Sequence, residues 1–404
     1  MGHRQWIFQE ISDVLNHSSV KKGLFALALG AFALGISEFV MMGILGNLAM
    51  DLNVSISRAG GLISAYAAGV CCGAPLLLFA RRQPLKRLML ILATVILFGN
   101  ALMVVAPNYH FMWVARFISG LPHGGYFGVG AILAHRLAKP GHQAAAMSYI
   151  TTGMTVATIM GVPLATAITD MVSWRIAFAL VALSALCTVV AIRIWVPQVK
   201  GLKDIGFWGQ FRFLGTAAPW LIFCGVLFGQ IGLYCWYSYI DPQMVFVAGF
   251  KMADMSWIMI IAGIGMFAGN LICGRLGDYY KPSLVAAVVQ MLGIIVLALF
   301  YSFAQYQIAA VVLMMFGTAI LFGPGSPLQT AVVGYSRGGE MLGAALIQIA
   351  YNLGNAIAAR IGGDVIARGY GYTAPALAGI PFIAVGCVLL FVLFYRYEQH
   401  SKRQ

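Results

Sequence analysis

The segment from Gly23 to Met50 constrains this chain more than any other stretch. Its 28 residues, GLFALALGAFALGISEFVMMGILGNLAM, carry a single charge, Glu38. A bilayer core about 30 Å thick is crossed by roughly 20 apolar residues of helix, so this segment is long enough to span a membrane. A carboxylate at that depth costs on the order of 2.5 kcal/mol unless it is paired, hydrated or protonated. We therefore expect Glu38 to face an internal cavity, where it meets a substrate or carries a proton.

The composition extends this reading to the whole chain. Of its 404 residues, 61% are hydrophobic and 9% are charged, against about 25% charged in soluble domains. This predicts a polytopic membrane protein, not an enzyme. The net charge of +13 does not indicate nucleic-acid binding, because the basic residues gather in short loops between apolar spans, as topology signals do. The sequence contains no phosphate-binding Gly-Lys motif, and its cysteines and histidines form no metal-binding or nucleophile motif, so we expect no ATP, metal or other cofactor.

Twelve spans can be marked, which predicts an all-α integral membrane protein with twelve transmembrane helices in two six-helix bundles. A cytoplasmic N-terminal segment (1–22) precedes the first bundle (23–196), and a linker (197–216) leads to the second bundle (217–396) and a tail (397–404). The expected spans are 23–46, 59–80, 86–106, 110–134, 144–169, 174–196, 217–240, 255–276, 283–303, 306–330, 341–366 and 374–395.

The distribution of Lys and Arg predicts the orientation. Of the 25 basic residues, 19 fall on the side of the two termini and the linker and 4 on the other side, while Arg116 and Arg360 lie within spans. Loops rich in Lys and Arg remain in the cytoplasm. Both termini are therefore expected in the cytoplasm. This agrees with an even number of spans, which requires the two termini to lie on the same side.

The two halves show an internal repeat. Gly69-Val-Cys-Cys-Gly73 in the second span aligns with Gly265-Met-Phe-Ala-Gly269 in the eighth, 196 residues later. Parallel repeats of this kind occur in secondary transporters, which bind substrate near the midplane between the repeats.

The fourth span carries two polar residues that we connect with Glu38. Arg116 is expected roughly 10 Å below the outer surface and Glu38 roughly 22 Å above the inner one, which is about the same depth in a 30 Å core. We expect the two residues to couple, with His123 as a proton relay. The alternatives are a static pair that fixes two helices and a hydrogen-bonded packing histidine.

The second half offers polar residues for substrate binding. Gln230 and Tyr234 lie one turn apart in the seventh span, deeper than the aromatic residues of its outer end. Spacing by three and four residues places a further set on one face of the eleventh span: Gln348, Tyr351, Asn352 and Asn355. Such a face looks toward water, substrate or another helix. The second half shows no buried acid that matches Glu38, and Arg360 with Asp364 is expected to form a local ion pair.

The eighth span ends in a candidate gate, with Asp278 beside Arg275 and Lys281. We expect Asp278 to latch the cytoplasmic side.

These motifs resemble the major facilitator superfamily over nearly the whole chain. The opening ALGISEFVMMGILGNLAMDLNVS is similar to the first span of its proton-coupled drug-efflux branch, and RFISGLPHGG resembles the motif whose embedded arginine, here Arg116, is implicated in proton coupling. MTVATIMGVP resembles the antiporter motif, and GRLGDYYKP resembles the gate motif, with Asp278 as its acid. The matching turn FARRQPLKR departs from that motif, because Arg82 stands where the acid would be. The stretches EFVMMG, GLPHGGYFGVGAI and GGEMLGAALIQIAYNLGNAIAA most resemble AraJ-type arabinose-efflux permeases.

The resemblance implies a monomeric transporter in the bacterial inner membrane that exports a sugar, a nucleoside or a drug by proton antiport. The proton gradient would supply the energy, and the partners would be the substrate, protons and lipid. Two alternatives stay open: a proton-coupled importer or uniporter of a sugar-like solute, and a non-transporting membrane sensor.

Overall fold

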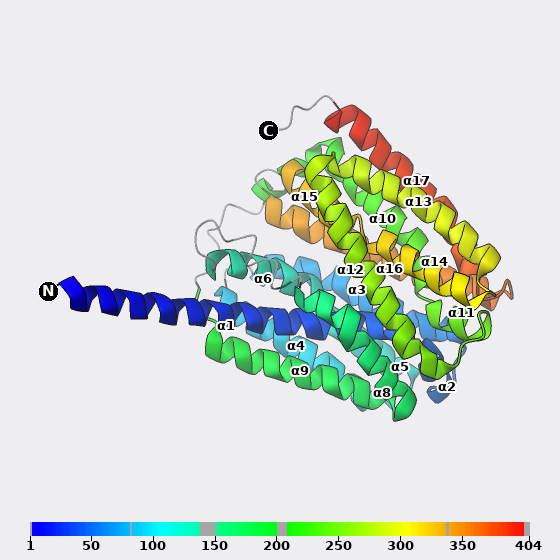
Figure 1. The fold of residues 1–404 in the computed structure, drawn as a ribbon, viewed down its shortest axis with the longest axis horizontal. Helices are drawn as coiled ribbons and strands as arrows, with labels where there is room; N and C mark the ends of the chain where they lie inside the picture. Colours follow the sequence, from blue (N-terminus) through cyan, green and yellow to red (C-terminus); the bar gives the residue numbers. More distant parts are fainter. Residues whose placement is uncertain are drawn as a thin grey trace.

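The chain folds into a bundle of helices, shown in Figure 1 as a computed structural model that describes residues 2–80, 83–137, 150, 152–199, 208–336 and 339–399. Every regular element in these ranges is helical. The N-terminal half contains α1 (Gly2–Gly43), α2 (Leu45–Asp51), α3 (Ile56–Ala80), α4 (Leu85–Val104), α5 (Tyr109–Gly120), α6 (His123–Leu137), the π-helical turn η1 (Ala157–Gly161), α8 (Val162–Met171) and α9 (Trp174–Trp195).

The C-terminal half follows residues 200–207 of the expected linker, which lie outside the described ranges. It contains η2 (Trp208–Gly215), α10 (Ala217–Tyr237), α11 (Ile240–Phe246), η3 (Met252–Asp254), α12 (Met255–Tyr279), α13 (Pro282–Phe303), α14 (Gln307–Phe322), α15 (Gly325–Tyr335), α16 (Glu340–Ala367), α17 (Ala374–Leu393) and η4 (Phe394–Glu398).

The helices agree with the expected spans. Within the described residues, ten helical stretches are long and apolar enough to cross a membrane. Two of the twelve expected spans are not among these ten stretches. The second expected span corresponds to α3, and the fourth corresponds to α5 and α6, which are separated by a turn at Leu121 and Pro122. Proline lacks a backbone N–H and interrupts a helix, so Pro122 explains why this span is broken.

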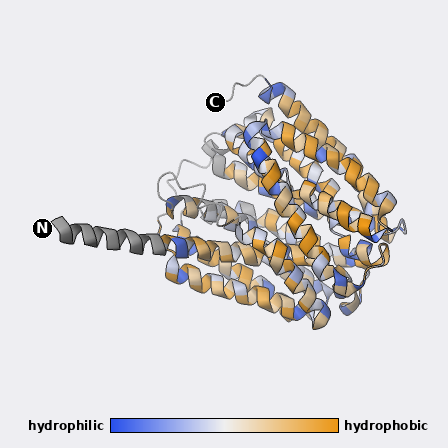
Figure 2. Cartoon of the chain, viewed as in Figure 1, coloured by the Kyte–Doolittle hydropathy of each residue, from blue (hydrophilic) through white to orange (hydrophobic). Residues whose placement is uncertain are grey.

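The helices consist mostly of hydrophobic residues (Figure 2). Large hydrophobic side chains are more than half exposed on helices from both halves, among them Phe98, Leu183, Phe316 and Val388. A contiguous exposed apolar surface of this extent requires a nonaqueous environment. The protein is therefore an all-helical membrane protein.

The repeated glycines have the same role in both halves. A Cβ atom on Gly73 would lie 1.8 Å from the Leu121 carbonyl oxygen, and a Cβ on Gly269 would lie 2.0 Å from the Ala319 carbonyl oxygen. Glycine thus lets α3 pack directly on the chain at the end of α5, and α12 on α14. The repeat at an offset of 196 residues reflects this shared packing.

The two halves meet along several helices. The Ser64 hydroxyl on α3 donates a hydrogen bond to the Ala356 carbonyl on α16, at 2.8 Å. The Gly46 N–H on α2 donates to the Asp241 carboxylate on α11, at 2.5 Å. In Figure 1, α2 and α11 lie at the end of the molecule remote from both termini. The helices of the two halves are thus joined at that remote end.

Candidate functional site

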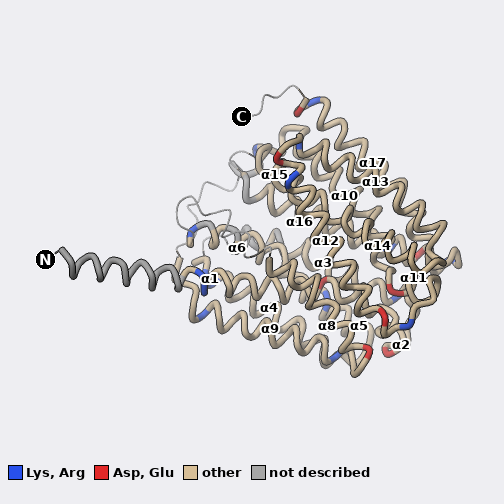
Figure 3. Tube along the Cα trace, viewed as in Figure 1, with Lys and Arg blue, Asp and Glu red and all other residues tan. Residues whose placement is uncertain are grey.

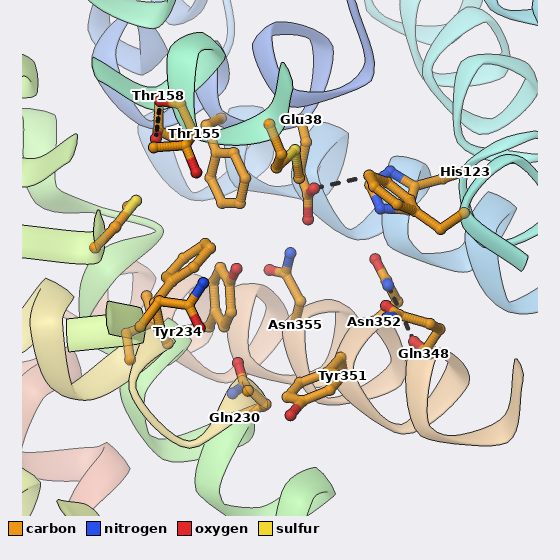
Figure 4. Close-up of a pocket in the computed structure, with 18 of the residues that line it drawn as sticks. Glu38, His123, Thr155, Thr158, Gln230, Tyr234, Gln348, Tyr351, Asn352 and Asn355 are labelled. Atoms are coloured by element: carbon orange, nitrogen blue, oxygen red, sulfur yellow. Dashed lines mark hydrogen bonds and ion pairs between the residues drawn. The ribbon is translucent and has the colours of Figure 1, made fainter. Parts of the chain in front are cut away.

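A cavity of about 250 Å³ lies between the two halves, near the middle of the helices (Figure 4). Both halves supply its walls. The lining residues are Glu38, Phe39, His123, Phe127, Met154, Thr155, Thr158, Gln230, Tyr234, Met266, Phe267, Asn270, Leu321, Phe322, Gly325, Gln348, Tyr351, Asn352 and Asn355.

Glu38 forms the acidic part of the N-terminal wall. It is carried by α1, the most deeply buried of the ten candidate spans, and its residue surface is only 6% exposed. Its Oε2 atom lies 3.8 Å from Nδ1 of His123, which begins α6 directly after the break at Pro122. The helix break thus places His123 beside the acid, and Figure 4 shows the two side chains facing each other across this part of the wall.

Tyr66 on α3 connects this pair to Arg116. Its hydroxyl lies 2.9 Å from Nδ1 of His123, in a hydrogen bond whose donor depends on the histidine tautomer. The guanidinium carbon of Arg116 lies 4.5 Å from the centre of the Tyr66 ring, a cation–π contact. Both Tyr66 and Arg116 are fully buried. Tyr66 was missed by the sequence reasoning, because a lone tyrosine in an apolar span looks like an ordinary core residue.

Arg116 lies behind the cavity wall. Its Nη1 donates to the Ser37 carbonyl at 2.5 Å and its Nε donates to the Leu62 carbonyl at 3.3 Å. Among the described residues it forms no ion pair with Glu38. Arg116 thus fixes the backbone next to Glu38 and contacts the ring of Tyr66.

The opposite wall comes from α10 and α16. Gln230 and Tyr234 lie on α10, and the four polar residues predicted on one face of α16 all line the cavity. Asn352 donates through Nδ2 to the Gln348 carbonyl at 3.0 Å. This bond fixes the amide orientation, so Oδ1 is its free acceptor. The Tyr351 hydroxyl and the Oδ1 atoms of Asn352 and Asn355 are buried and have no hydrogen-bond partner among the described residues.

These features define what the cavity can accommodate. Buried polar atoms without partners cost about 1–3 kcal/mol each, so α16 presents groups that a ligand or water would satisfy. Phe39, Phe127 and Phe322 add apolar surface. The described lining contains one carboxylate and no Lys or Arg. A site of this kind suits a small molecule with hydrogen-bonding groups and an apolar part.

The structure brings together most of the residues singled out from the sequence. Eight of them line the cavity: Glu38, His123, Gln230, Tyr234, Gln348, Tyr351, Asn352 and Asn355. The gate residues lie elsewhere. Asp278 and Arg275 are exposed at the end of α12, where Asp278 forms no ion pair with any described residue. Arg82 lies outside the described ranges.

As expected from the sequence, the C-terminal half contributes no acid to the described lining of the cavity that would match Glu38. It does contain a buried acid elsewhere that sequence reasoning did not single out, Asp241 on α11, whose surface is 1% exposed. Its position at the end of a span, among aromatic residues typical of a membrane interface, hid it from sequence reasoning. The expected ion pair between Arg360 and Asp364 is confirmed, at 3.1 Å.

A multi-pass helical bundle whose two repeated halves enclose a polar cavity is the architecture of a membrane transporter. A family model described as the Major Facilitator Superfamily matches residues 27–344. The chain belongs to this superfamily, and it is a secondary transporter.

Proteins with similar sequences support this assignment. The chain is 38% identical over 382 residues to AraJ of Escherichia coli (strain K12), a protein named as a transporter, and the match covers 94% of this chain and 97% of AraJ. It is 31% identical to the inner membrane transport protein YdhP of the same organism, over 93% of this chain and 96% of YdhP.

Solved structures share the fold. A bacterial homologue of the human lysosomal transporter Spinster, in an inward-facing and unoccupied conformation, matches with a TM-score of 0.74 and 13% identity, over 95% of this chain and 99% of that one. The nucleoside transporter NupG matches with a TM-score of 0.70 and 13% identity, over 94% and 100%.

Proposed function

We propose that this protein exports a small molecule across the bacterial inner membrane by proton antiport with alternating access. The observation that carries the proposal is the contact between Glu38 and His123 in the wall of the central cavity, 3.8 Å apart. A membrane-embedded acid is costly, and its position in the cavity allows substrate and proton to compete for it. Arg116 and His123 would assist Glu38 in proton coupling.

The proposed orientation places both termini in the cytoplasm. In Figure 3, Lys and Arg residues cluster at the end that carries the termini, and fewer of them lie at the remote end. This charge distribution is the one expected for cytoplasmic termini. The remote end of the molecule would then face outward, and the exposed Asp278 and Arg275, together with the partly buried Lys281, would belong to the cytoplasmic gate.

The proposed substrate is a neutral polar or amphiphilic molecule, sugar-like or drug-like. The polar residues that would bind it are Glu38, Gln230, Tyr234, Gln348, Tyr351, Asn352 and Asn355. The unpartnered atoms of α16 favour a molecule with hydrogen-bonding groups, and the phenylalanine side chains favour one with an apolar face.

The test is substrate-induced proton movement in proteoliposomes that hold a pH-sensitive dye. A panel of sugars, nucleosides and lipophilic cations is added to the wild type, to Glu38→Gln and to Asp254→Asn. Asp254 is the matched control, because it lies outside the cavity and its hydrogen bonds stay within its own loop. We expect a compound-specific proton flux in the wild type and in Asp254→Asn, and its loss in Glu38→Gln.

Other results would assign the protein differently. Substrate movement without proton flux would favour the alternative of a uniporter, and inward movement of substrate together with protons would favour a proton-coupled importer. No response to any compound of the panel would leave the transporter fold standing and would place the substrate outside these chemical classes.

A further inference from the structure

Helix α2 begins with backbone donors that its own helix cannot satisfy. Helix α1 ends at Gly43 and the chain bends at Ile44 before α2 starts at Leu45. The first helical N–H groups have no acceptor within the helix. The first bond within the turn is the one from the Leu48 N–H to the Ile44 carbonyl, which leaves Gly46 near the start of α2 in need of an acceptor from elsewhere.

That acceptor comes from the opposite half of the molecule. The Gly46 N–H donates to Oδ2 of Asp241 at 2.5 Å, although the two residues are 195 positions apart. A carboxyl oxygen that accepts a backbone N–H at the start of a helix satisfies a donor that the helix itself leaves open. Asp241 on α11 therefore stabilises the start of α2 across the interface between the halves.

The contact depends on glycine at position 46. A Cβ atom there would lie 3.0 Å from Oδ2 of Asp241 and 3.2 Å from the terminal methyl of Met252. A side chain would therefore crowd the carboxylate and displace it. The neighbouring Asn47 donates through Nδ2 to Oδ1 of Asp170, at 3.0 Å, while Oδ2 of Asp170 is buried without a partner in the described structure.

We propose that Asp241 is a positioning residue that holds the remote end of the transporter closed through its bond to Gly46. The proposal rests on the alternating-access part of the proposed function, in which α2 and α11 must separate for the remote end to open. Separation removes the N–H partner of Asp241 and brings its carboxylate out of the buried interface. A buried N–H left without its acceptor costs about 1–3 kcal/mol, which corresponds to roughly a 5- to 100-fold change in the ratio of closed to open molecules.

The proposal is tested by a distance measurement across the remote end. Spin labels are attached to cysteines that replace Val105 and Tyr370, in a background without the native cysteines. Both positions are exposed, and they belong to different halves. Double electron–electron resonance without substrate or proton gradient reports the closed and open populations directly. The measurement does not depend on proton antiport. A negative result for Asp241 can therefore be distinguished from a negative result for the proposed function.

We expect Asp241→Ala to raise the ratio of the long-distance to the short-distance population at least about fivefold. Asp241→Asn should remain close to the wild type, because the amide oxygen still accepts from Gly46. The matched control is Asp254→Ala, a carboxylate at the same end whose bonds to Lys251 and Trp257 stay within one half.

Gly46→Ala provides a second variant that keeps the N–H group and crowds the carboxylate. It should open the remote end less than Asp241→Ala, and it should add little in the Asp241→Ala background, because residues that act through one contact are not additive. The proposal is overturned if Asp241→Ala leaves the distances unchanged, if Asp254→Ala shifts them equally, or if Asp241→Asn opens the molecule as much as alanine does.

Discussion

The hydroxyl of Tyr66 and Nδ1 of His123 lie 2.9 Å apart in the interior of the N-terminal half. The same tyrosine ring stacks below the guanidinium of Arg116. Through these contacts the arginine behind the cavity wall is joined to the His123–Glu38 pair that lines it. We therefore predict that a change of charge at Glu38 affects Arg116 through the intermediate side chains of His123 and Tyr66.

Replacement of Tyr66 by phenylalanine separates its two contacts. Tyr66→Phe removes the hydrogen bond to His123 and keeps the ring beside Arg116. A hydrogen bond contributes about 1 kcal/mol, so we expect the substrate-driven proton flux in proteoliposomes to fall several-fold, with little loss of thermal stability. Tyr66→Leu also removes the cation–π contact, so its free energy of unfolding should be about 0.5–2 kcal/mol lower than that of Tyr66→Phe. Equal behaviour of the two variants would contradict separate roles for hydroxyl and ring.

Two glycines of the N-terminal half should respond to alanine in opposite directions. A Cβ on Gly73 would meet the Leu121 carbonyl at 1.8 Å, whereas a Cβ on Gly128 has nothing within 4 Å. Overpacking against backbone costs about 1–3 kcal/mol or more, while alanine in an open helical position stabilises by about 1 kcal/mol. Thermal unfolding in detergent should show Gly73→Ala destabilised and Gly128→Ala slightly stabilised. A stable Gly73→Ala would show that α3 does not need this close approach.

The sequence could predict the parts of the fold and site that depend on local pattern. The apolar spans follow from hydropathy, and the polar face of α16 follows from helical spacing, since residues 348, 351, 352 and 355 share one side. Glu38 was recognised because an acid in an apolar span is costly. Tyr66 and Asp241 could not be assigned, because each acquires its meaning from a distant partner: His123 for the first and Gly46 for the second. Such pairings exist only once the helices are packed.

The contacts of Arg116 likewise could not be predicted from the sequence, because they depend on how the helices pack. Its depth in the membrane was expected to match that of Glu38, and the coupling of the two residues stays a prediction. Depth alone could not show that Ser37 and Leu62 carbonyls would take up two of its donors. The hydrogen bonds depend on the rotation of α1 and α3 about their axes, which composition and spacing do not determine.

Two buried asparagines should separate binding from stability. Asn355 lines the cavity with an unpartnered Oδ1, while Asn100 accepts from the Ser37 hydroxyl at 3.0 Å and donates to the Ile96 carbonyl at 2.8 Å. Asn355→Ala removes an unsatisfied acceptor, so stability should hold or rise while the transport KM increases. Asn100→Ala leaves the Ser37 hydroxyl without its acceptor and should destabilise by about 1–3 kcal/mol. Measurement of KM and thermal unfolding for both variants would check this, and a loss of stability in Asn355→Ala would contradict it.

The surface pair of Asp51 and Arg175 should make a small, acid-sensitive contribution to stability. Partial burial raises the pKa of Asp51, but hydrogen bonds from Arg175 and Trp174 outweigh this effect and hold the pKa below its ordinary value. The donor atoms of these two residues lie 2.8 and 2.9 Å from Oδ2 of Asp51. A group whose pKa is lower in the folded state stabilises the protein above its unfolded pKa, about 3.9 for aspartate.

This contribution should therefore be present at neutral pH and disappear as the pH falls through the lowered pKa of Asp51. Both side chains are more than one third exposed, so solvent screening limits the effect to about 0.2–1 kcal/mol. Asp51→Asn should lower the unfolding temperature slightly at pH 7 and should approach the wild type at pH values below the lowered pKa of Asp51, where the carboxyl is protonated. Because the pair is at the surface, high salt should reduce the difference. A difference between the two proteins that grows as the pH falls would reverse the sign and show that Asp51 is held protonated in the folded protein.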